Sequence, residues 1–237
     1  MTSSEKPGPT GNFEFDALRW AVNYRRALFN EFAPYLTGEV IEVGAGIGQF
    51  TELIAKSPGV RKVIAVEPDP QFCAQMRERL PEQALVQGIV TDLQPGTACD
   101  AVVSVNVLEH IENDLSELSG YARLLKARRG CLCLFVPARQ EIYAPIDGDF
   151  GHFRRYSKPE LRAKLNRAGF EAVKLHYFNF VGYFAWWFTF CLLGKRGFAP
   201  GSVRFFDAFV LPVVHGLERR VMRPPFGQSL LIVARVA

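Results

Sequence analysis

A glycine-rich loop in the first quarter of the chain has the composition of a ligand-binding turn. It reads Glu42-Val-Gly44-Ala-Gly46-Ile-Gly48, after a short β-branched run and before a helix-patterned segment. Glycines let the backbone approach a ligand closely and leave the amide groups of a helix start free to face it. A dinucleotide fingerprint requires glycine at its sixth position, where this chain has Gln49. The loop therefore indicates a ligand site that does not suit NAD or FAD, with a purely structural turn as the alternative.

Two acidic residues extend this candidate site. Glu67 is expected to end the second strand and Asp92 the third. Glu67 can accept hydrogen bonds from two ribose hydroxyls, and Asp92 from an exocyclic amine such as adenine N6. Because doubly wound sheets bind ligands at the carboxyl ends of their strands, the loop and the two acids together predict a nucleoside-binding edge. Either acid alone would more often be an ordinary surface residue.

Two histidines could accept a proton near such a site. Imidazole is the side chain whose ordinary pKa lies nearest neutrality, so a positioned histidine can act as a general base. His110 follows the fourth expected strand, and His152 lies in the loop after the fifth. The alternatives are a packing role for His110 and, for His152, a structural clasp with residues 153–156. Neither histidine has a cysteine or aspartate at ligand spacing, so the sequence predicts no metal site.

Strand-like and helix-like segments alternate along the chain, and this alternation positions the candidate residues. We expect strands at residues 38–43, 63–67, 84–93, 100–105, 131–137, 171–178 and 228–236. Strands that alternate with helices are typical of parallel sheets with crossover connections. The sequence therefore predicts an α/β fold with a doubly wound, seven-stranded, mostly parallel sheet and helices on both faces.

Three helices have recognisable ends. Apolar spacing from residue 13 to about residue 36 predicts a first helix that Pro34 limits. The segment 113–130 predicts an amphipathic helix with Gly130 as its stop signal. A third helix should begin at the capping pattern of Ser157 and Glu160 and end at Gly169.

The composition fits one large cytosolic domain. The chain has 237 residues, of which 49% are hydrophobic, enough for a substantial core. Its net charge of +4 comes without a long Lys/Arg tract, which argues against a dedicated nucleic-acid binder. The five cysteines form no CxxC pair, and we expect them to be reduced. Residues 1–12 have the composition of a disordered tail, so the domain should span residues 13–237.

Three motifs resemble those of a known family. E-V-G-A-G-I-G, V-E-P-D and V-L-E-H-I are similar to segments of the class I, Rossmann-like S-adenosylmethionine-dependent methyltransferases, over about residues 20–178 and the last strand. The resemblance implies S-adenosylmethionine as cofactor, S-adenosylhomocysteine as product, and a last strand antiparallel to its neighbours. By analogy the cofactor-binding residues are Glu42, Gly44, Ala45, Gly46 and Gly48 on the methionine and ribose side, Glu67 and Pro68 at the ribose, Asp92 and Leu93 at the adenine, and Asn106 beside the sulfonium. From the first helix, Tyr24 and Arg25 could close over the cofactor's carboxylate or could simply be solvated.

The loop after the fifth strand resembles one subgroup of this family. Its sequence, GDFGHFRRYSKPEL, is similar to bacterial members of the broad group that includes ubiquinone-pathway O-methyltransferases. The N-Y-R of the first helix and the P-P-F-G-Q-S-L before the last strand fit the same group. This resemblance implies O-methylation of an apolar small molecule or of a lipid-linked or secondary-metabolite acceptor. The expected acceptor-pocket residues are Tyr143, Phe153, Arg154, Tyr156, Phe180, Trp186 and Trp187.

A long uncharged stretch opens the insertion expected at about residues 179–227. Between Lys174 and Lys195 no side chain carries a formal charge. A membrane span is disfavoured because Asn179 and Gly182 interrupt the stretch and leave too few apolar residues to cross a bilayer. A helix buried against the core is one alternative. We favour a helical, apolar lid that walls the acceptor pocket and makes peripheral contact with the inner membrane surface, with Lys195, Arg196 and Arg204 at headgroup level.

Two rival functions are compatible with parts of this pattern. A non-catalytic S-adenosylmethionine-binding partner subunit would keep the glycine loop and both acids without turnover. An NAD-dependent oxidoreductase would share the sheet, but Gln49 disfavours it. The sequence makes no prediction of the oligomeric state.

Overall fold

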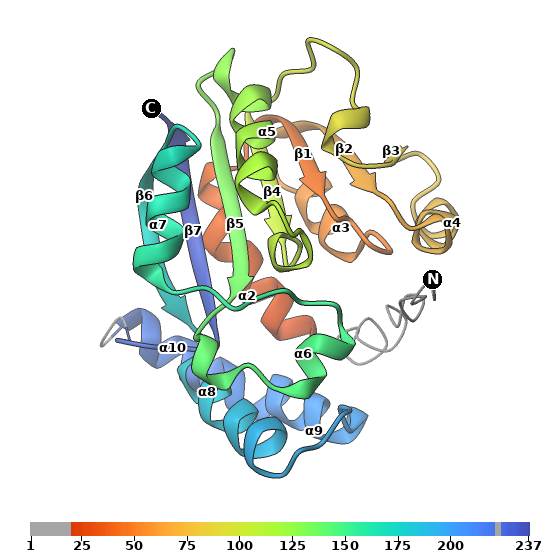
Figure 1. Cartoon of the computed structure of the whole chain (residues 1–237). Helices are drawn as coiled ribbons and strands as arrows, with labels where there is room; N and C mark the ends of the chain where they lie inside the picture. The colour runs from red at the N-terminus through yellow and green to blue at the C-terminus, as the bar shows by residue number, and fades with distance from the viewer. Residues whose placement is uncertain (1–19, 221–223) are drawn as a thin grey trace, which may run out of the picture.

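The computed structural model describes residues 20–220 and 224–237, and its centre is a seven-stranded sheet. The strand order is β3-β2-β1-β4-β5-β7-β6 (Figure 1). The strands are β1 (Gly38–Val43), β2 (Val60–Glu67), β3 (Ala84–Gln87), β4 (Ala101–Val105), β5 (Cys131–Pro137), β6 (Phe170–Phe178) and β7 (Ser229–Val236). The first five are parallel, and β7 is antiparallel to both β5 and β6. The expected sheet is therefore confirmed.

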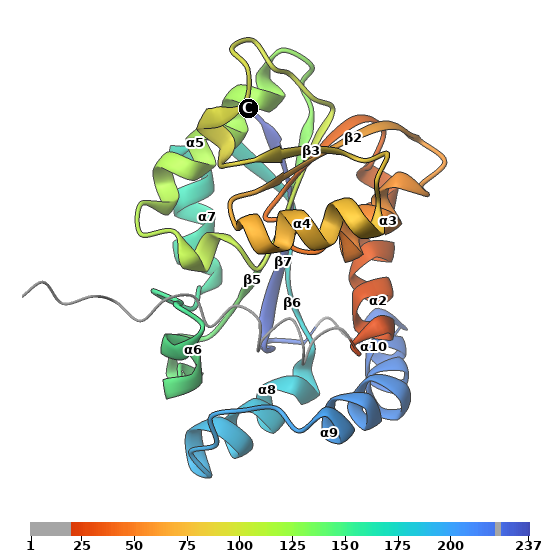
Figure 2. The same cartoon turned by 90° about the vertical axis from the view of Figure 1, so that its right-hand side faces the viewer.

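Helices cover both faces of this sheet. They are α2 (Val22–Phe32), α3 (Gln49–Ala55), α4 (Pro70–Arg79), α5 (Asp114–Lys126), α6 (Pro145–Asp149), α7 (Lys158–Arg167), α8 (Phe180–Trp186), α9 (Pro200–Phe205) and α10 (Leu211–Arg220). Leucines of α5 and α7 pack on one face of the sheet, and apolar residues of α2 and α3 pack on the other. Figure 2 shows these two helix pairs on opposite sides of the strands. The sheet is thus doubly wound, and the carboxyl ends of its parallel strands remain open to loops.

Strand β5 is continuously apolar because helices cover it on both faces. All seven of its residues are buried, as expected for a strand covered on both faces. Cys131 and Cys133 point to the α2 and α3 side, while Leu132 and Leu134 point to the α5 and α7 side. All five cysteines are free thiols in the structure.

The first helix is shorter than its apolar spacing predicts. α2 begins at Val22 and ends at Phe32, and a 3-10 turn, η1 (Ala33–Tyr35), follows because Pro34 cannot continue the hydrogen-bond ladder. Residues 13–19 of the expected helix, and the expected tail at residues 1–12, lie outside the described residues.

Glycines 130 and 169 end their helices differently. Gly169 adopts the expected left-handed conformation, with φ of +83°, and Ser157 caps α7 by accepting from the Glu160 amide at 3.4 Å. After α5 the left-handed residue is Arg129, with φ of +49°, instead of Gly130. Gly130 is needed for a different reason, because a Cβ there would overlap the Asp100 carbonyl.

The third strand ends earlier than predicted. β3 stops at Gln87, and Asp92 belongs to a 3-10 turn, η2 (Val90–Asp92). The Asp92 carboxylate accepts from the Ile89 amide at 2.8 Å and lies over Gly88, where a Cβ would overlap it. This Asx-type turn breaks the strand, so Asp92 follows β3 across a loop and does not end it.

The insertion between β6 and β7 forms a helical layer at the carboxyl end of the sheet. It contains α8, α9 and α10 with two π-helical segments, η5 (Trp187–Leu192) and η6 (Phe206–Val210), and both views show it beside the strand tips (Figures 1 and 2). Asn179 begins α8 by accepting from the Gly182 amide at 2.9 Å. Within residues 20–220 and 224–237, none of the helices combines the length and apolar character that a membrane crossing requires.

Candidate functional site

The glycine loop turns sharply between β1 and α3. Gly44, Gly46 and Gly48 have φ values of +73°, +54° and +79°, a region that favours glycine. At Gly44 a Cβ would also overlap the side chain of Val107. The amides of Gly44 and Ala45 donate to the Val66 carbonyl at 2.9 and 3.2 Å, which ties the loop to β2.

Glu67 joins the end of β2 to the glycine loop. One of its carboxylate oxygens accepts from the Gly46 amide at 2.7 Å, and the other accepts from the Asp69 amide at 2.9 Å. Burial raises the pKa of Glu67, although these two hydrogen bonds oppose the shift. Pro68 follows Glu67 as an exposed residue, and Asp69 caps α4. The expected acid therefore lies directly beside the expected loop.

A second carboxyl group, Glu42, lies beneath the loop. It is 3% exposed and accepts a hydrogen bond from the Thr51 hydroxyl at the start of α3. Burial raises its pKa to about 8, and the nearby Glu67 adds to the shift. Glu42 is therefore largely protonated at neutral pH.

The two residues expected from the first helix have different environments. Arg25 donates from Nη1 to the Gln49 side chain at 2.8 Å, next to Gly48. Tyr24 packs edge-on against Phe135 and Phe178, with ring centroids 6.2 and 5.4 Å away, and burial raises its pKa. The contact of α2 with the glycine loop is thus made by Arg25, while the Tyr24 ring belongs to the core.

Asn106 directly follows β4 and begins the second half of the site. It is half-buried and has a φ of +52°, which asparagine tolerates better than most residues. Its amide donates to the Phe135 carbonyl at 2.9 Å. The left-handed turn leads at once into η3 (Leu108–His110), which brings Glu109 and His110 to the same sheet edge. Leu93, by contrast, lies with Asp92 beyond the end of β3.

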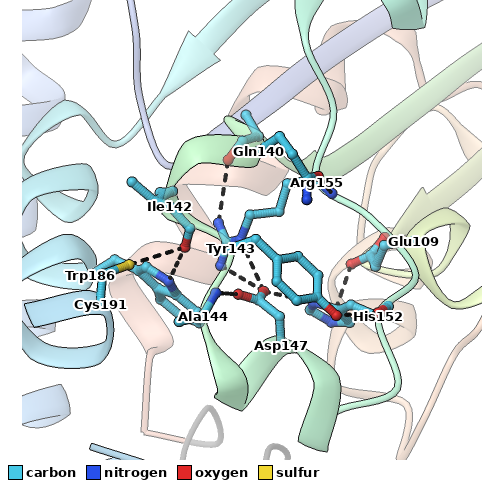
Figure 3. A network of polar contacts seen from close by, with 11 residues as sticks. Glu109, Gln140, Ile142, Tyr143, Ala144, Asp147, His152, Arg155, Trp186 and Cys191 are labelled. Carbon is cyan, nitrogen blue, oxygen red and sulfur yellow. Dashed lines mark hydrogen bonds and ion pairs between the residues drawn. The ribbon is translucent and has the colours of Figure 1, made fainter. Parts of the chain in front are cut away.

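A buried cluster of acids and imidazoles forms between η3 and the loop that contains α6. His152 Nδ1 lies 3.0 Å from an Asp147 oxygen, and its Nε2 lies 4.0 Å from Glu109 Oε1 (Figure 3). The rings of His110 and His152 meet edge-on with centroids 4.6 Å apart. The Phe153 amide donates to the Glu109 carbonyl at 2.8 Å and holds the loop against η3. The structure therefore brings the two predicted histidines together.

Asp147 organises this cluster. It is 0% exposed and accepts from Arg155 Nε at 3.0 Å, from Arg155 Nη2 at 2.8 Å and from the Ala144 amide at 2.8 Å (Figure 3). Burial alone would raise the pKa of Asp147, but the hydrogen bonds from His152 and Arg155 hold it below its ordinary value. As a carboxylate, Asp147 accepts from Nδ1–H of His152 and so orients the ring with Nε2 toward Glu109.

His110 is neutral at physiological pH. Burial and the neighbouring His152 together lower its pKa to about 4, although a hydrogen bond to the Phe150 backbone opposes the shift. His110 thus contributes an uncharged imidazole to the cluster.

Two of the residues expected to line an acceptor pocket are structural. Tyr156 is 0% exposed, and its hydroxyl lies 2.9 Å from an Asp114 oxygen and 3.1 Å from the Leu108 carbonyl. Arg154 donates to the Ile111 and Glu112 carbonyls at 3.1 and 2.9 Å and pairs with Asp114 at 2.7 Å. These contacts clasp the loop onto η3, which corrects the pocket role expected for Tyr156 and Arg154.

The other expected pocket residues are divided between core and surface. Trp186 is buried, donates from Nε1 to the Ile142 carbonyl at 3.0 Å and carries the Arg155 guanidinium 4.3 Å above its ring (Figure 3). Trp187 and Phe153 are each 45% exposed. Two more belong to neighbouring packing: the Tyr143 hydroxyl donates to the His152 carbonyl at 2.7 Å, and the Phe180 ring packs on Phe226. Trp186 is therefore a core residue of the insertion and not a wall of a pocket.

Glu109 and Asp147 belong to the cluster although no residue pattern in the sequence singled them out. Within residues 20–220 and 224–237, Glu109, His110 and His152 form a group whose ligand atoms all lie within 4.8 Å of one another, close enough to hold a metal ion. Spacing along the chain hides this set, because its members come from two segments about forty residues apart. The adjacent E-H pair and an aspartate five residues before His152 were the available signals.

Comparison with known proteins identifies the family. A family model described as a methyltransferase domain matches residues 41–133. A Mycobacterium tuberculosis protein named "Probable S-adenosylmethionine-dependent methyltransferase" is 30% identical over 166 residues, which cover 68% of this chain and 60% of the relative. The chain belongs to the family of class I S-adenosylmethionine-dependent methyltransferases. The expected family and its cofactor are thereby confirmed.

Further matches agree with the fold. A Methylobacterium nodulans trans-aconitate 2-methyltransferase is 31% identical over 102 residues, covering 43% of this chain and 39% of that protein. A solved S-adenosylmethionine-dependent methyltransferase from Clostridium acetobutylicum superposes with a TM-score of 0.62 at 8% identity, over 94% of this chain and 96% of that one. The chain spans only 60% of the length of its mycobacterial relative.

Proposed function

We propose that this methyltransferase moves the methyl group of S-adenosylmethionine to an oxygen of an apolar or lipid-linked acceptor. The observation that carries the proposal is the position of the imidazole cluster. η3 begins two residues after Asn106, the residue that the family resemblance assigns to the sulfonium side. The expected nucleoside-binding edge and the two imidazoles therefore adjoin at the end of β4.

In this proposal the cofactor lies along the carboxyl ends of β1, β2 and β4. Glu67, beside the Gly46 amide, accepts from the ribose hydroxyls. Asp92 and Leu93 flank the adenine from the turn after β3, and Arg25 lies nearest the methionine carboxylate. Ligand binding at strand carboxyl ends is the general behaviour of doubly wound sheets and supports this placement.

The reaction needs alignment more than activation of the methyl group. The acceptor oxygen loses its proton and attacks the methyl carbon, and the carbon–sulfur bond breaks to leave neutral S-adenosylhomocysteine. Holding the oxygen in line with that bond can supply roughly 7–11 kcal/mol in favourable cases. Asp147 orients His152 so that Nε2 faces Glu109, and we expect the acceptor oxygen to ionise on this side.

The surface of the insertion supports an apolar acceptor. Most of the exposed large hydrophobic side chains of the described chain lie on it: Phe184, Trp187, Phe188, Leu192, Leu193, Phe205, Phe209, Val213 and Leu217. We call this set the insertion patch. Contiguous exposed apolar surface commonly marks a binding face, and peripheral contact with a membrane surface would deliver a lipid-linked acceptor to the strand ends.

Charged residues beside the patch fit this contact only in part. Lys195 is exposed, as expected for a residue at headgroup level. Arg196 pairs with Asp149, and the Arg204 guanidinium lies 3.6 Å from the Trp20 ring centroid. Apolar contact therefore carries more of the proposed membrane affinity than these cations do.

The proposal is tested by following the label of methyl-labelled S-adenosylmethionine. The full chain is incubated with the lipid extract and, separately, with the aqueous metabolite extract of its source cells. We expect an organic-soluble product whose label alkali releases from an ester or retains in an ether, as O-methylation requires. Label that enters only aqueous products would refute the apolar acceptor. Cofactor binding without transfer in either extract would favour the non-catalytic partner subunit.

A further inference from the structure

Glu109, His110 and His152 have the chemistry of a metal ligand set. Their ligand atoms lie within 4.8 Å of one another, and Glu109 and His152 are 0% and 9% exposed. Zinc ligands at about 2.0–2.2 Å in tetrahedral geometry are about 3.4 Å apart. The 4.0 Å between His152 Nε2 and Glu109 Oε1 needs to shorten by less than an ångström to reach that spacing.

The two imidazoles are also oriented as metal ligands commonly are. A metal-bound histidine usually donates its other ring N–H to a carboxylate or a backbone carbonyl, which fixes the ring. His152 has Asp147 on Nδ1 at 3.0 Å, and His110 has a hydrogen bond to the Phe150 backbone. Asp147 is itself held by Arg155, whose positive charge balances that of the Asp147 carboxylate (Figure 3). Both imidazoles therefore have a hydrogen-bond partner behind the proposed ligand atoms.

We infer that Glu109, His110 and His152 bind one divalent transition-metal ion of the Zn²⁺ type beside the methyl-transfer site. Two nitrogen ligands and one oxygen ligand favour such ions over Mg²⁺ or Ca²⁺, which prefer all-oxygen sets. Three protein ligands leave a fourth position open, the arrangement of catalytic and not of structural zinc.

The role of the ion rests on the proposed function. An acceptor hydroxyl in the open position would bind the metal through oxygen, and the ion would lower the pKa of that hydroxyl. With the ion bound, the hydroxyl would lose its proton to solvent, its oxygen would attack the methyl carbon, and the carbon–sulfur bond would break. His152 then acts on the acceptor through the ion and does not itself accept the proton.

The test titrates Zn²⁺ into the chelator-treated full chain by calorimetry and records the absorption spectrum of the Co²⁺ form. We expect one ion per chain and a Co²⁺ spectrum without thiolate charge transfer, because the five cysteines take no part. Asp147→Asn should weaken Zn²⁺ about 10–100-fold by loosening His152. His152→Ala and Glu109→Gln should each weaken it further, and His176→Ala on β6 should leave it unchanged.

Two results would overturn the site. One is absence of Zn²⁺ binding by the folded wild-type chain, and the other is equal affinity in wild type, His152→Ala and Glu109→Gln, which would indicate adventitious binding. Binding of S-adenosylhomocysteine by the chelator-treated chain keeps this test separate from the proposed function. Methyl transfer at the full rate after chelation would refute the role of the ion but not the proposed methyltransferase activity. Zn²⁺ binding without any methyl transfer would support the metal site but refute the proposed methyltransferase activity.

Discussion

At the scale of single residues, Glu67 carries the clearest prediction. Its carboxylate already accepts from the Gly46 and Asp69 amides, and the proposed ribose bonds would add to these. Losing hydrogen bonds to a charged group typically costs about 1.5–3 kcal/mol. Glu67→Ala should therefore weaken S-adenosylhomocysteine about ten- to a hundredfold in calorimetry. Unchanged affinity in a variant that melts cooperatively would contradict the ribose assignment.

The buried Glu42 predicts a pH dependence of stability. Its pKa is about 8 in the folded chain against an ordinary value of 4.5, so the folded state holds a proton that the unfolded state releases. The free energy of unfolding should fall as the pH rises from about 4.5 to about 8 and level off above it. Each pKa unit corresponds to about 1.4 kcal/mol, so the fall amounts to a few kcal/mol.

Glu42→Gln isolates this effect, because glutamine keeps an oxygen for the Thr51 hydroxyl. In this variant the free energy of unfolding should not fall between about pH 4.5 and pH 8. Above pH 8 the variant should therefore be more stable than the wild type. Urea denaturation at pH 5 and pH 9 measures both curves. Parallel pH profiles in the two proteins would show that Glu42 titrates normally.

Residue types alone predicted the glycine loop, Glu67 and the two histidines, because each follows a recognisable strand. The partners of the histidines could not be predicted in the same way. Asp147 reaches His152 only because α6 and the loop after it fold back, and Glu109 faces His152 only because the Phe153 amide binds its carbonyl. Such contacts depend on tertiary structure and leave no spacing pattern in the chain.

At the scale of elements, Asp207 predicts a link between the insertion and the first helix. Its two carboxylate oxygens accept from the Asn23 and Tyr24 amides at 2.9 and 2.8 Å, so a residue of η6 caps the start of α2. Removing a helix cap costs about 0.5–2 kcal/mol. Asp207→Ala should lower stability by about this amount and raise amide hydrogen exchange in α2 and α9.

Asp207→Asn is the matched control, because it keeps one acceptor oxygen and should fall between wild type and Asp207→Ala. Affinity for S-adenosylhomocysteine should change little in either variant. Wild-type exchange throughout α2 in Asp207→Ala would mean that the cap does not stabilise the helix.

Element order was predictable, and some element ends were not. Apolar runs identify β1, β4, β5 and β7 because those strands are covered on both faces, and their burial follows from the topology. β3 has no buried residue and ends at a turn that the Asp92 side chain makes with the Ile89 amide. A side-chain bond to the backbone therefore overrode the apolar pattern there.

At the scale of the whole molecule, the insertion patch predicts membrane affinity. Trp187→Ser together with Phe188→Ser should markedly reduce flotation of the full chain with vesicles made of phosphatidylethanolamine and phosphatidylglycerol. These side chains are 45% and 52% exposed, so their loss should leave stability nearly unchanged. The matched control replaces Ile89 and Val173, which are 51% and 55% exposed outside the insertion, with serine. Equal flotation of both double variants would exclude the patch as the membrane contact.

Trp186 and Phe190 of the insertion do not belong to this exposed patch. Both are buried, at 7% and 4% exposed, and pack with Ile142, Ala144 and Ile146. Their apolar character predicted a wall around an acceptor, but the structure uses them to attach the insertion to α6. Length and hydropathy could predict the insertion and its helices, whereas which face is buried depends on the partner it meets.

Methyl transfer by His152→Ala tests most directly whether the nucleoside edge and the imidazole cluster form one active site. With methyl-labelled S-adenosylmethionine and lipid extract, the variant should turn over about 10²–10⁴-fold more slowly than wild type. Its affinity for S-adenosylhomocysteine should stay within a factor of about two, since His152 packs on Asp147 and not on the glycine loop. His176→Ala should behave as wild type. Full activity in His152→Ala, or equal loss of activity and cofactor affinity, would contradict the account.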